Sequence, residues 1–466
     1  MSVARQIGTN WFTVVMGVGI MAGLCYSSPV AFPFHKTLGV AAFIVVLLLL
    51  VLALTLWGAR WINHTEEALS DFRDPSRALF YGALAMAVNV VGNDFFLVGT
   101  HIWPIALSMR ISQILWLVGV AISLFSAIAV PYLMFTQHDI APGDALASWL
   151  IPVVPPIVCA ADGANLLSDW GSPAVNMGMT VFDIALFGLT FFLFLMVSAL
   201  FYSRLMYHRV VPGAMAPSVW VEIGPIGMAM GTLATIPLST HSLFAAFLPG
   251  LRAIGLIGGS ALWGVGIWWC VIATLYTVLH LSKKGEGIPY TLGWWSYVFP
   301  LGSFTAGTYA LYHLTQLRFF YVAGFLQLVF LSGCFVIVSL GTLKGIMNGT
   351  LIAWHPRHHL GLQNNVADGK ADDPFGLESA LFKCDLRHHV GGIGHENQMG
   401  VRRTGCDFLD DGANDLDIGV DQIIAVHTGF ASNASGNDNN VGTRCLIVGV
   451  AACDHAVVPF NRGRFL

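Results

Sequence analysis

The stretch LGVAAFIVVLLLLVLALTLWGA occupies residues 38–59 and contains no charged side chain. A helix of about 20 apolar residues is long enough to cross the roughly 30 Å hydrocarbon core of a bilayer. Residues 319–343 form a second run of the same kind, also without a charge. The two stretches therefore predict transmembrane helices and an integral membrane protein.

The composition of the whole chain supports this prediction. Of its 466 residues, 56% are hydrophobic and 10% are charged, whereas soluble domains carry about 25% charged residues. The net charge of −4 is too small to indicate a nucleic-acid partner, and we expect none. The eight cysteines include no CxxC pair, so we predict no metal site and no cofactor.

Further apolar stretches predict an all-α membrane protein with ten transmembrane helices in total. The fifth stretch is interrupted by Pro152, Pro155 and Pro156. The predicted spans lie near residues 9–27, 38–59, 79–99, 111–131, 147–167, 176–203, 217–238, 253–280, 288–312 and 319–343.

Basic residues between the spans predict the orientation, because cytoplasmic loops carry an excess of Lys and Arg. With the N-terminus inside, the inner loops hold Arg5, Arg60, Arg73, Arg77, Arg204, Arg209, Lys283, Lys284 and Lys344. The outer loops hold only Lys36, Arg110, Arg252 and Arg318. We therefore predict a multi-pass protein of the cell (inner) membrane with both termini in the cytoplasm.

The odd-numbered spans contain most of the helix-breaking residues. Besides the three prolines of the fifth span, these are Gly17, Gly19, Gly224, Pro225 and Pro300, the last preceded by Phe299. A proline within a helix removes a hydrogen bond, and broken helices are tolerated mainly where they face protein or a water-filled cavity. The pattern predicts an inner ring of kinked odd helices around a path. Alternatively, the small residues only allow neighbouring helices to pack closely.

Acidic residues lie within four of the spans, and ionisable groups at membrane depth are functional candidates. They are Asp94, Asp162, Asp183 and Glu222. Asp94 and Asp162 approach the outer mouth, where a carboxylate could accept a proton from a coupled transport cycle. As alternatives, both are wetted helix-end residues, and Glu222 caps the positive end of its helix.

Four motifs then stand in order along the chain: NWFTVVMGVGI at 10–20, WLIPVVPP at 149–156, WVEIGPIG at 220–227 and WWSYVFP at 294–300. Together with Arg73-Asp-Pro75, they resemble the tellurite-resistance/dicarboxylate transporter family. Its relatives include malate permeases, sulfite efflux pumps and plant slow anion channels. The resemblance covers residues 1 to about 353.

The resemblance implies five hairpins in a quasi-fivefold arrangement around a central pore, and a homotrimer. It implies transport of small anions, either C4 dicarboxylates such as malate or oxyanions such as sulfite; a tellurite-resistance-type anion channel is the alternative. In relatives, the phenylalanine at the position of Phe299 plugs the pore. Without the resemblance, Phe299 would be interpreted as a packed core aromatic.

A membrane enzyme or sensor is the competing class. An enzyme should gather its reactive groups at depth, but His101, His241 and His280 lie near helix ends and form no recognisable motif. We therefore predict that the chain is not an enzyme.

The composition changes after about residue 353, which divides the chain into a transmembrane domain at 1–353 and a polar tail at 354–466. The tail is interpreted as a low-order cytoplasmic regulatory segment or as the product of a shifted reading frame. A metal-binding appendage using Cys384, His388, His389 and Cys406 is the third alternative, although its spacing matches no standard zinc pattern.

Overall fold

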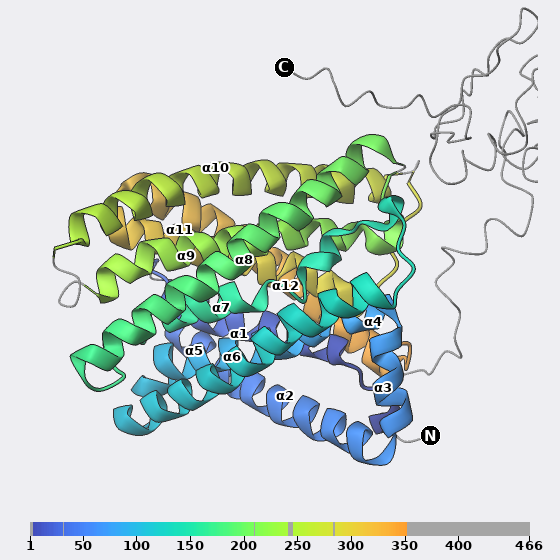
Figure 1. The fold of residues 1–466 in the computed structure, drawn as a ribbon, viewed down its shortest axis with the longest axis horizontal. Coiled ribbons are helices and arrows are strands. Elements are labelled where there is room, and N and C mark those ends of the chain that lie inside the picture. Colours follow the sequence, from blue (N-terminus) through green and yellow to red (C-terminus); the bar gives the residue numbers. More distant parts are fainter. Residues whose placement is uncertain (1–2, 31, 209, 241–245, 283–284, 352–466) are drawn as a thin grey trace, which may run out of the picture. The chain divides into compact units, whose positions relative to one another are not determined.

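The computed structural model describes residues 3–30, 32–208, 210–240, 246–282 and 285–351. Every regular element within these residues is an α-helix or a 3-10 helix (Figure 1). His241 and the predicted tail from residue 354, with its three interpretations, lie outside the described residues.

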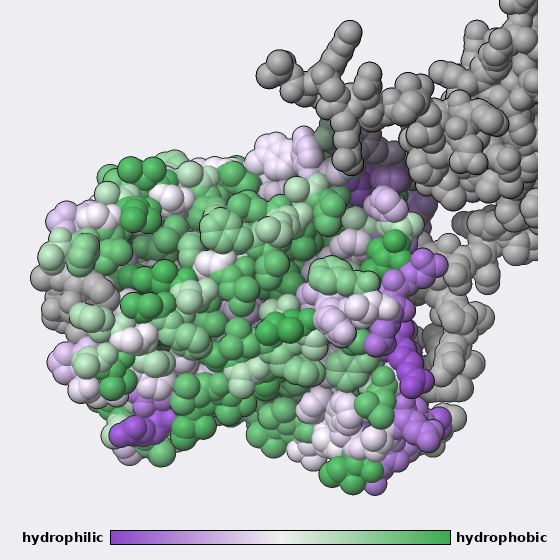
Figure 2. All heavy atoms as spheres, in the orientation of Figure 1, coloured by the Kyte–Doolittle hydropathy of each residue, from purple (hydrophilic) through white to green (hydrophobic). Residues whose placement is uncertain are grey.

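Five long helices form the outside of the bundle, and we call them the outer helices. They are α2 (His35–Asn63), α6 (Ile105–Thr136), α8 (Pro173–Tyr207), α10 (Leu248–Leu281) and α12 (Arg318–Met347). In their most apolar windows only 17–39% of the residues are buried, so these helices present apolar side chains outward. Figure 2 shows the resulting hydrophobic flank, with hydrophilic residues gathered at the right-hand end.

Five shorter helices lie inside, and four of them follow a 3-10 turn. We call these units the inner segments: η2 (Thr9–Trp11) with α1 (Phe12–Ser27), α5 (Tyr81–Leu97), η5 (Ala147–Leu150) with α7 (Pro155–Gly163), η6 (Gly213–Glu222) with α9 (Ile223–Ser239), and η7 (Leu292–Tyr297) with α11 (Phe299–Thr315). Three of them lie in candidate spans whose most apolar windows are 72–83% buried. The core therefore sits among the inner segments.

Among the described residues, eight helices are long and apolar enough to cross a membrane. The predicted spans 147–167 and 288–312 fall outside this set, although both coincide with helical segments. The reason is interruption: residues 151–154 separate η5 from the nine residues of α7, and Val298 separates η7 from the 17 residues of α11. Prolines occupy the first turns of both helices, where their missing N–H costs nothing but where the preceding segment cannot continue as one regular helix.

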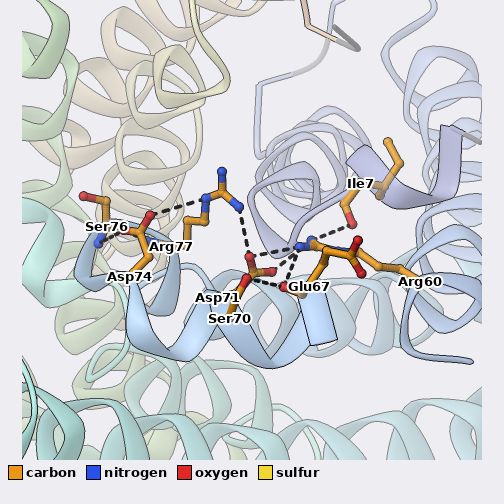
Figure 3. A network of polar contacts seen from close by, with 8 residues as sticks. All are labelled: Ile7, Arg60, Glu67, Ser70, Asp71, Asp74, Ser76 and Arg77. Atoms are coloured by element: carbon orange, nitrogen blue, oxygen red, sulfur yellow. Dashed lines mark hydrogen bonds and ion pairs between the residues drawn. The ribbon is translucent and has the colours of Figure 1, made fainter. Parts of the chain in front are cut away.

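A buried ion-pair network ties an outer helix to the chain that leads into α1 (Figure 3). Arg60, near the end of α2, pairs with Asp71 of α3 (Thr65–Arg73) at 2.9 Å, and both are almost fully buried. Arg60 also donates to the carbonyl of Ile7 at 3.3 Å, between η1 (Val3–Gln6) and η2. Arg77 of α4 (Pro75–Ala78) adds a second contact to Asp71. We call this end, at the right in Figure 1, the α3–α4 end and the opposite one the distal end.

Two short elements complete the connections. They are η3 (Gly99–His101) after α5 and η4 (Pro142–Asp144) before η5.

Candidate functional site

The inner segments contact one another in a closed order. Along the chain α1 contacts α5, α5 contacts α7, α7 contacts α9 and α9 contacts α11, and α11 contacts α1 again. Glycines allow the close approaches. A Cβ atom at Gly82 of α5 would lie 1.9 Å from the carbonyl oxygen of Ile151, and one at Gly227 of α9 would lie 2.3 Å from the backbone nitrogen of Phe304. The ring of inner segments in this order of contacts is the candidate site.

Helix breaks occur inside the bundle where the prolines predict them. The turn at Pro152 separates η5 from α7, which begins at Pro155 and Pro156. In the next inner segment, η6 passes into α9 just before Gly224 and Pro225. The last segment breaks at Val298, so Phe299 and Pro300 begin α11.

The predicted kink at Gly17 and Gly19 is different. Helix α1 runs through both glycines without interruption. A Cβ at Gly17 would lie 2.2 Å from the Trp295 ring, and one at Gly19 would lie 2.6 Å from Val90. The two glycines therefore allow close packing against neighbouring side chains, and their predicted role as pore-lining kinks stays a prediction.

Each of the five inner segments contains an uninterrupted stretch of buried residues. We call these stretches together the buried zone: residues 12–19, 81–92, 150–160, 216–230 and 297–305. At 1.5 Å per residue, the shortest stretch corresponds to about 12 Å of helix. Every glycine, proline and phenylalanine predicted to line or gate the path lies in the buried zone. The predicted role of each in transport stays a prediction.

A partly exposed residue bounds the buried zone on every segment. At the distal end these are Ile20, Asn93, Ala161, Gly231 and Ala306, which we call the distal set. At the α3–α4 end they are Trp11, Phe80, Trp149, Met215 and Ser296. The buried zone is therefore a middle section of the inner segments, bounded at each end by partly exposed residues.

Phe299 begins α11 and shares one face of that helix with two later residues. Residues four and seven positions after it, Ser303 and Ala306, lie on the same face of α11 because of the 3.6-residue period. Phe299 itself is 3% exposed and Ala306 is partly exposed. Phe304 points elsewhere, since its ring would lie 2.2 Å from a Cβ at Gly266 of α10. The face of α11 that contains both residues is therefore buried at Phe299 and partly exposed at Ala306.

The two predicted acids of the distal half, Asp94 and Asp162, are both buried. Asp94 is 1% exposed and faces α1, where Cβ atoms at Gly19 and Gly23 would lie 3.2 and 2.9 Å from its oxygens. Asp162 is 7% exposed. One oxygen of each carboxyl has no hydrogen-bond partner among the described residues.

The other two acids join inner segments to the outer helix α8. Glu222, at the end of η6, accepts a hydrogen bond from Ser198 of α8. Asp183 of α8 points back at α7, where a Cβ at Gly163 would lie 2.4 Å from its Oδ1. Glu222 thus lies in the buried zone, but its carboxyl is directed toward α8.

An amide pair that the sequence did not single out bridges two inner segments. Asn165, two residues beyond the end of α7, donates from Nδ2 to Oδ1 of Asn93 on α5 at 3.1 Å. Both side chains are partly exposed. In the sequence, each asparagine stands out only as a polar residue in an apolar span. Their positions along the chain do not indicate that the two side chains meet.

The inner segments contain no Lys or Arg. Within the part of the chain that the structure describes, no group of three or more His, Cys, Asp or Glu side chains could hold a metal ion. Charge on a ligand would therefore have to be balanced by polar groups and helix ends.

Comparisons with known proteins give the class. A family model described as voltage-dependent anion channel matches residues 6–343. An uncharacterized transporter of Methanocaldococcus jannaschii is 30% identical, over 76% of this chain and 98% of the relative. The sulfite efflux pump of Trichophyton rubrum is 26% identical, over 64% and 80%. The malic acid transport protein of Schizosaccharomyces pombe is 20% identical, over 62% and 67%.

Apolar helices surrounding a buried set of inner segments define a multi-pass helical membrane protein. The match over most of its length shows that the chain belongs to the voltage-dependent anion channel family, as the motifs of the sequence predicted. It transports anions across a membrane and is not an enzyme.

Proposed function

We propose that the chain carries small oxyanions through a path enclosed by the five inner segments, with Phe299 as the gate. The substrate class is C4 dicarboxylates such as malate or sulfur oxyanions such as sulfite. The names of the sulfite efflux pumps and malic acid transport proteins among its relatives support both choices. A tellurite-resistance-type anion channel is the alternative within the same family.

The observation that carries the proposal is the buried zone with Phe299 inside it. Hydrophobic constrictions gate channels by excluding water and ions, and a phenylalanine on an otherwise small-residue face suits this role. Three inner helices also begin within the bundle, at Pro155, Ile223 and Phe299. Helix N-termini carry partial positive charge, so they can stabilise an anion without Lys or Arg.

The same proposal includes ten membrane crossings arranged as five hairpins with quasi-fivefold symmetry. The closed order of contacts among the inner segments supports it, and the uninterrupted outer helices supply the return crossings. We further propose a homotrimer in the cell (inner) membrane, with both termini in the cytoplasm. Arg60, Arg73 and Arg77 at the α3–α4 end favour that orientation. The transmembrane domain would comprise residues 1–353, followed by a polar cytoplasmic tail.

The gate is tested by flux measurements on the protein reconstituted in liposomes. Phe299→Ala should increase the flux of sulfite and malate, because it removes the aromatic ring from the closed face. Phe304→Ala is the matched control, since it empties the same volume on the face of α11 that packs against α10. An unchanged flux in Phe299→Ala, or an equal increase in Phe304→Ala, would overturn the gate.

Proton coupling is proposed for Asp94 and Asp162, with Glu222 as a third candidate. The unpartnered oxygens support it, because such an oxygen can take up a proton without breaking an existing bond. Malate uptake by liposomes containing Asp94→Asn should lose its response to an imposed pH gradient. A response equal to that of the wild type would refute coupling through Asp94.

A further inference from the structure

We infer that Asn93 and Asn165 form an anion-recognition contact at the distal end of the buried zone. The inference rests on the transport path proposed above and names residues that determine its specificity. The ligand is an anion that presents two oxygen atoms from one group, as a carboxylate or sulfite does.

The pair is placed where an anion would meet the buried zone. Asn93 belongs to the distal set, so it is the first partly exposed residue of α5 beyond that zone. Asn165 follows the end of α7, where its backbone N–H donates to the carbonyl of Asp162 at 3.2 Å and fixes the turn. The 3.1 Å bond between the two amides then holds both side chains in one position.

The mutual hydrogen bond leaves donors available. A primary amide has two N–H donors and one acceptor oxygen. The bond uses one donor of Asn165 and the oxygen of Asn93, and the side chains make no other hydrogen bond to the described residues. Both donors of Asn93 and one of Asn165 therefore remain. Because they come from two amides at a fixed separation, they suit two oxygens of one ligand group better than a single halide ion.

The charges nearby make these donors important. The inner segments contain no Lys or Arg, and the nearest ionisable groups to the pair along the chain are the carboxyls of Asp94 and Asp162. An anion at this depth gains nothing from those carboxyls, so the amides must supply the attraction. Neutral donors also bind weakly enough for release, which conduction requires.

The test measures half-saturating concentrations for sulfite, malate and chloride in liposomes. Asn93→Leu and Asn165→Leu remove the donors and keep the branched shape of the side chain. Each should raise the values for sulfite and malate about tenfold and leave that for chloride within about threefold, since a hydrogen bond to a charged ligand is lost. The double variant should raise the half-saturating concentrations little beyond either single variant, because the amides act as one unit. Should Asn93→Leu fail to fold, Asn93→Ser removes the amide without overfilling the site and has the same expected result.

Asn89→Leu is the matched control. Asn89 lies one turn earlier on α5, but its amide is buried and donates to Ala85 and to Cys159 Sγ. The control should lower thermal stability. It should leave the ratio of the half-saturating concentrations for sulfite and chloride unchanged.

Three results would overturn the inference. If Asn93→Leu and Asn165→Leu retain flux and leave the ratio of the half-saturating concentrations for sulfite and chloride unchanged, the inference is overturned but the proposed path is not. An equal change of the ratio in Asn89→Leu would reduce the pair to a structural role. No flux of any anion in the wild type or in Phe299→Ala would overturn the proposed path and the inference together.

Discussion

The inner segments and the outer helices are both apolar, yet they differ in length, continuity and surroundings. The inner helices have 9–17 residues and the outer helices 29–35. Glycines show the difference most directly. A Cβ at Gly82 would collide with the backbone of the next segment, whereas one at Gly188 of α8 would meet nothing within 4 Å. Apolarity brings a helix into the membrane, and burial of most of its residues distinguishes a segment that lies inside the bundle.

The largest expected effect comes from placing a leucine at Gly82, with the same substitution at Gly188 as its control. Gly82→Leu should prevent folding, because even its Cβ would overlap the carbonyl of Ile151. Gly188→Leu should be neutral or stabilise α8 by up to about 1 kcal/mol, the helix propensity lost at glycine. Thermal unfolding in detergent, with size-exclusion chromatography to detect folded protein, compares the two. Similar losses in both variants would contradict the assignment of inner and outer regions.

The next effect tests the connection between the two regions. Asp71→Ala should destabilise the protein by about 3–5 kcal/mol, because it leaves the buried Arg60 without its carboxylate. Glu67→Gln removes the partly exposed pairs with Arg5 and His64 and should cost about 1 kcal/mol or less. The free energies of unfolding of both variants provide the measurement. Equal values would mean that the Arg60 pair does not fix the entry to α1.

Hydropathy and helix breakers predicted much of this organisation from the sequence. The charge-free run at 38–59 lies within α2, and the break at Phe299 and Pro300 is where α11 begins. These features depend on local chain properties, so a single sequence reveals them. The count of ten crossings stays a prediction, because α7 and α11 are too short to satisfy length and hydropathy alone.

Side-chain direction could not be predicted in the same way. Depth along a span does not determine the face, so Glu222 was a candidate for the path although Ser198 binds it from α8. The pairing of Asn93 with Asn165 depends on how two segments 72 residues apart pack together. Gly17 was predicted to lie at a pore-lining kink. Its close contact with the ring of Trp295 depends on how two distant segments pack, which the sequence alone does not show.

The smallest effect concerns the hydrogen bond between Glu222 of an inner segment and Ser198 of an outer helix. Ser198→Ala removes its single hydrogen bond from α8 and should cost about 1–3 kcal/mol of stability. Anion flux should remain at the wild-type level, since the contact lies between an inner segment and an outer helix. Parallel flux and thermal-unfolding measurements check both expectations. A changed flux with unchanged stability would place Ser198 in the transport path.

The central claim is that the inner segments enclose a path closed at Phe299, and cysteine labelling tests it most directly. In a background with the eight native cysteines replaced, Ser296→Cys and Ser303→Cys would be exposed to a membrane-impermeant thiol reagent added at the α3–α4 end. We predict rapid labelling of Ser296→Cys and protection of Ser303→Cys, which lies beyond Phe299, with the protection lost when Phe299→Ala is added. Equal labelling of both positions with Phe299 present, or protection that persists in Phe299→Ala, would contradict the account.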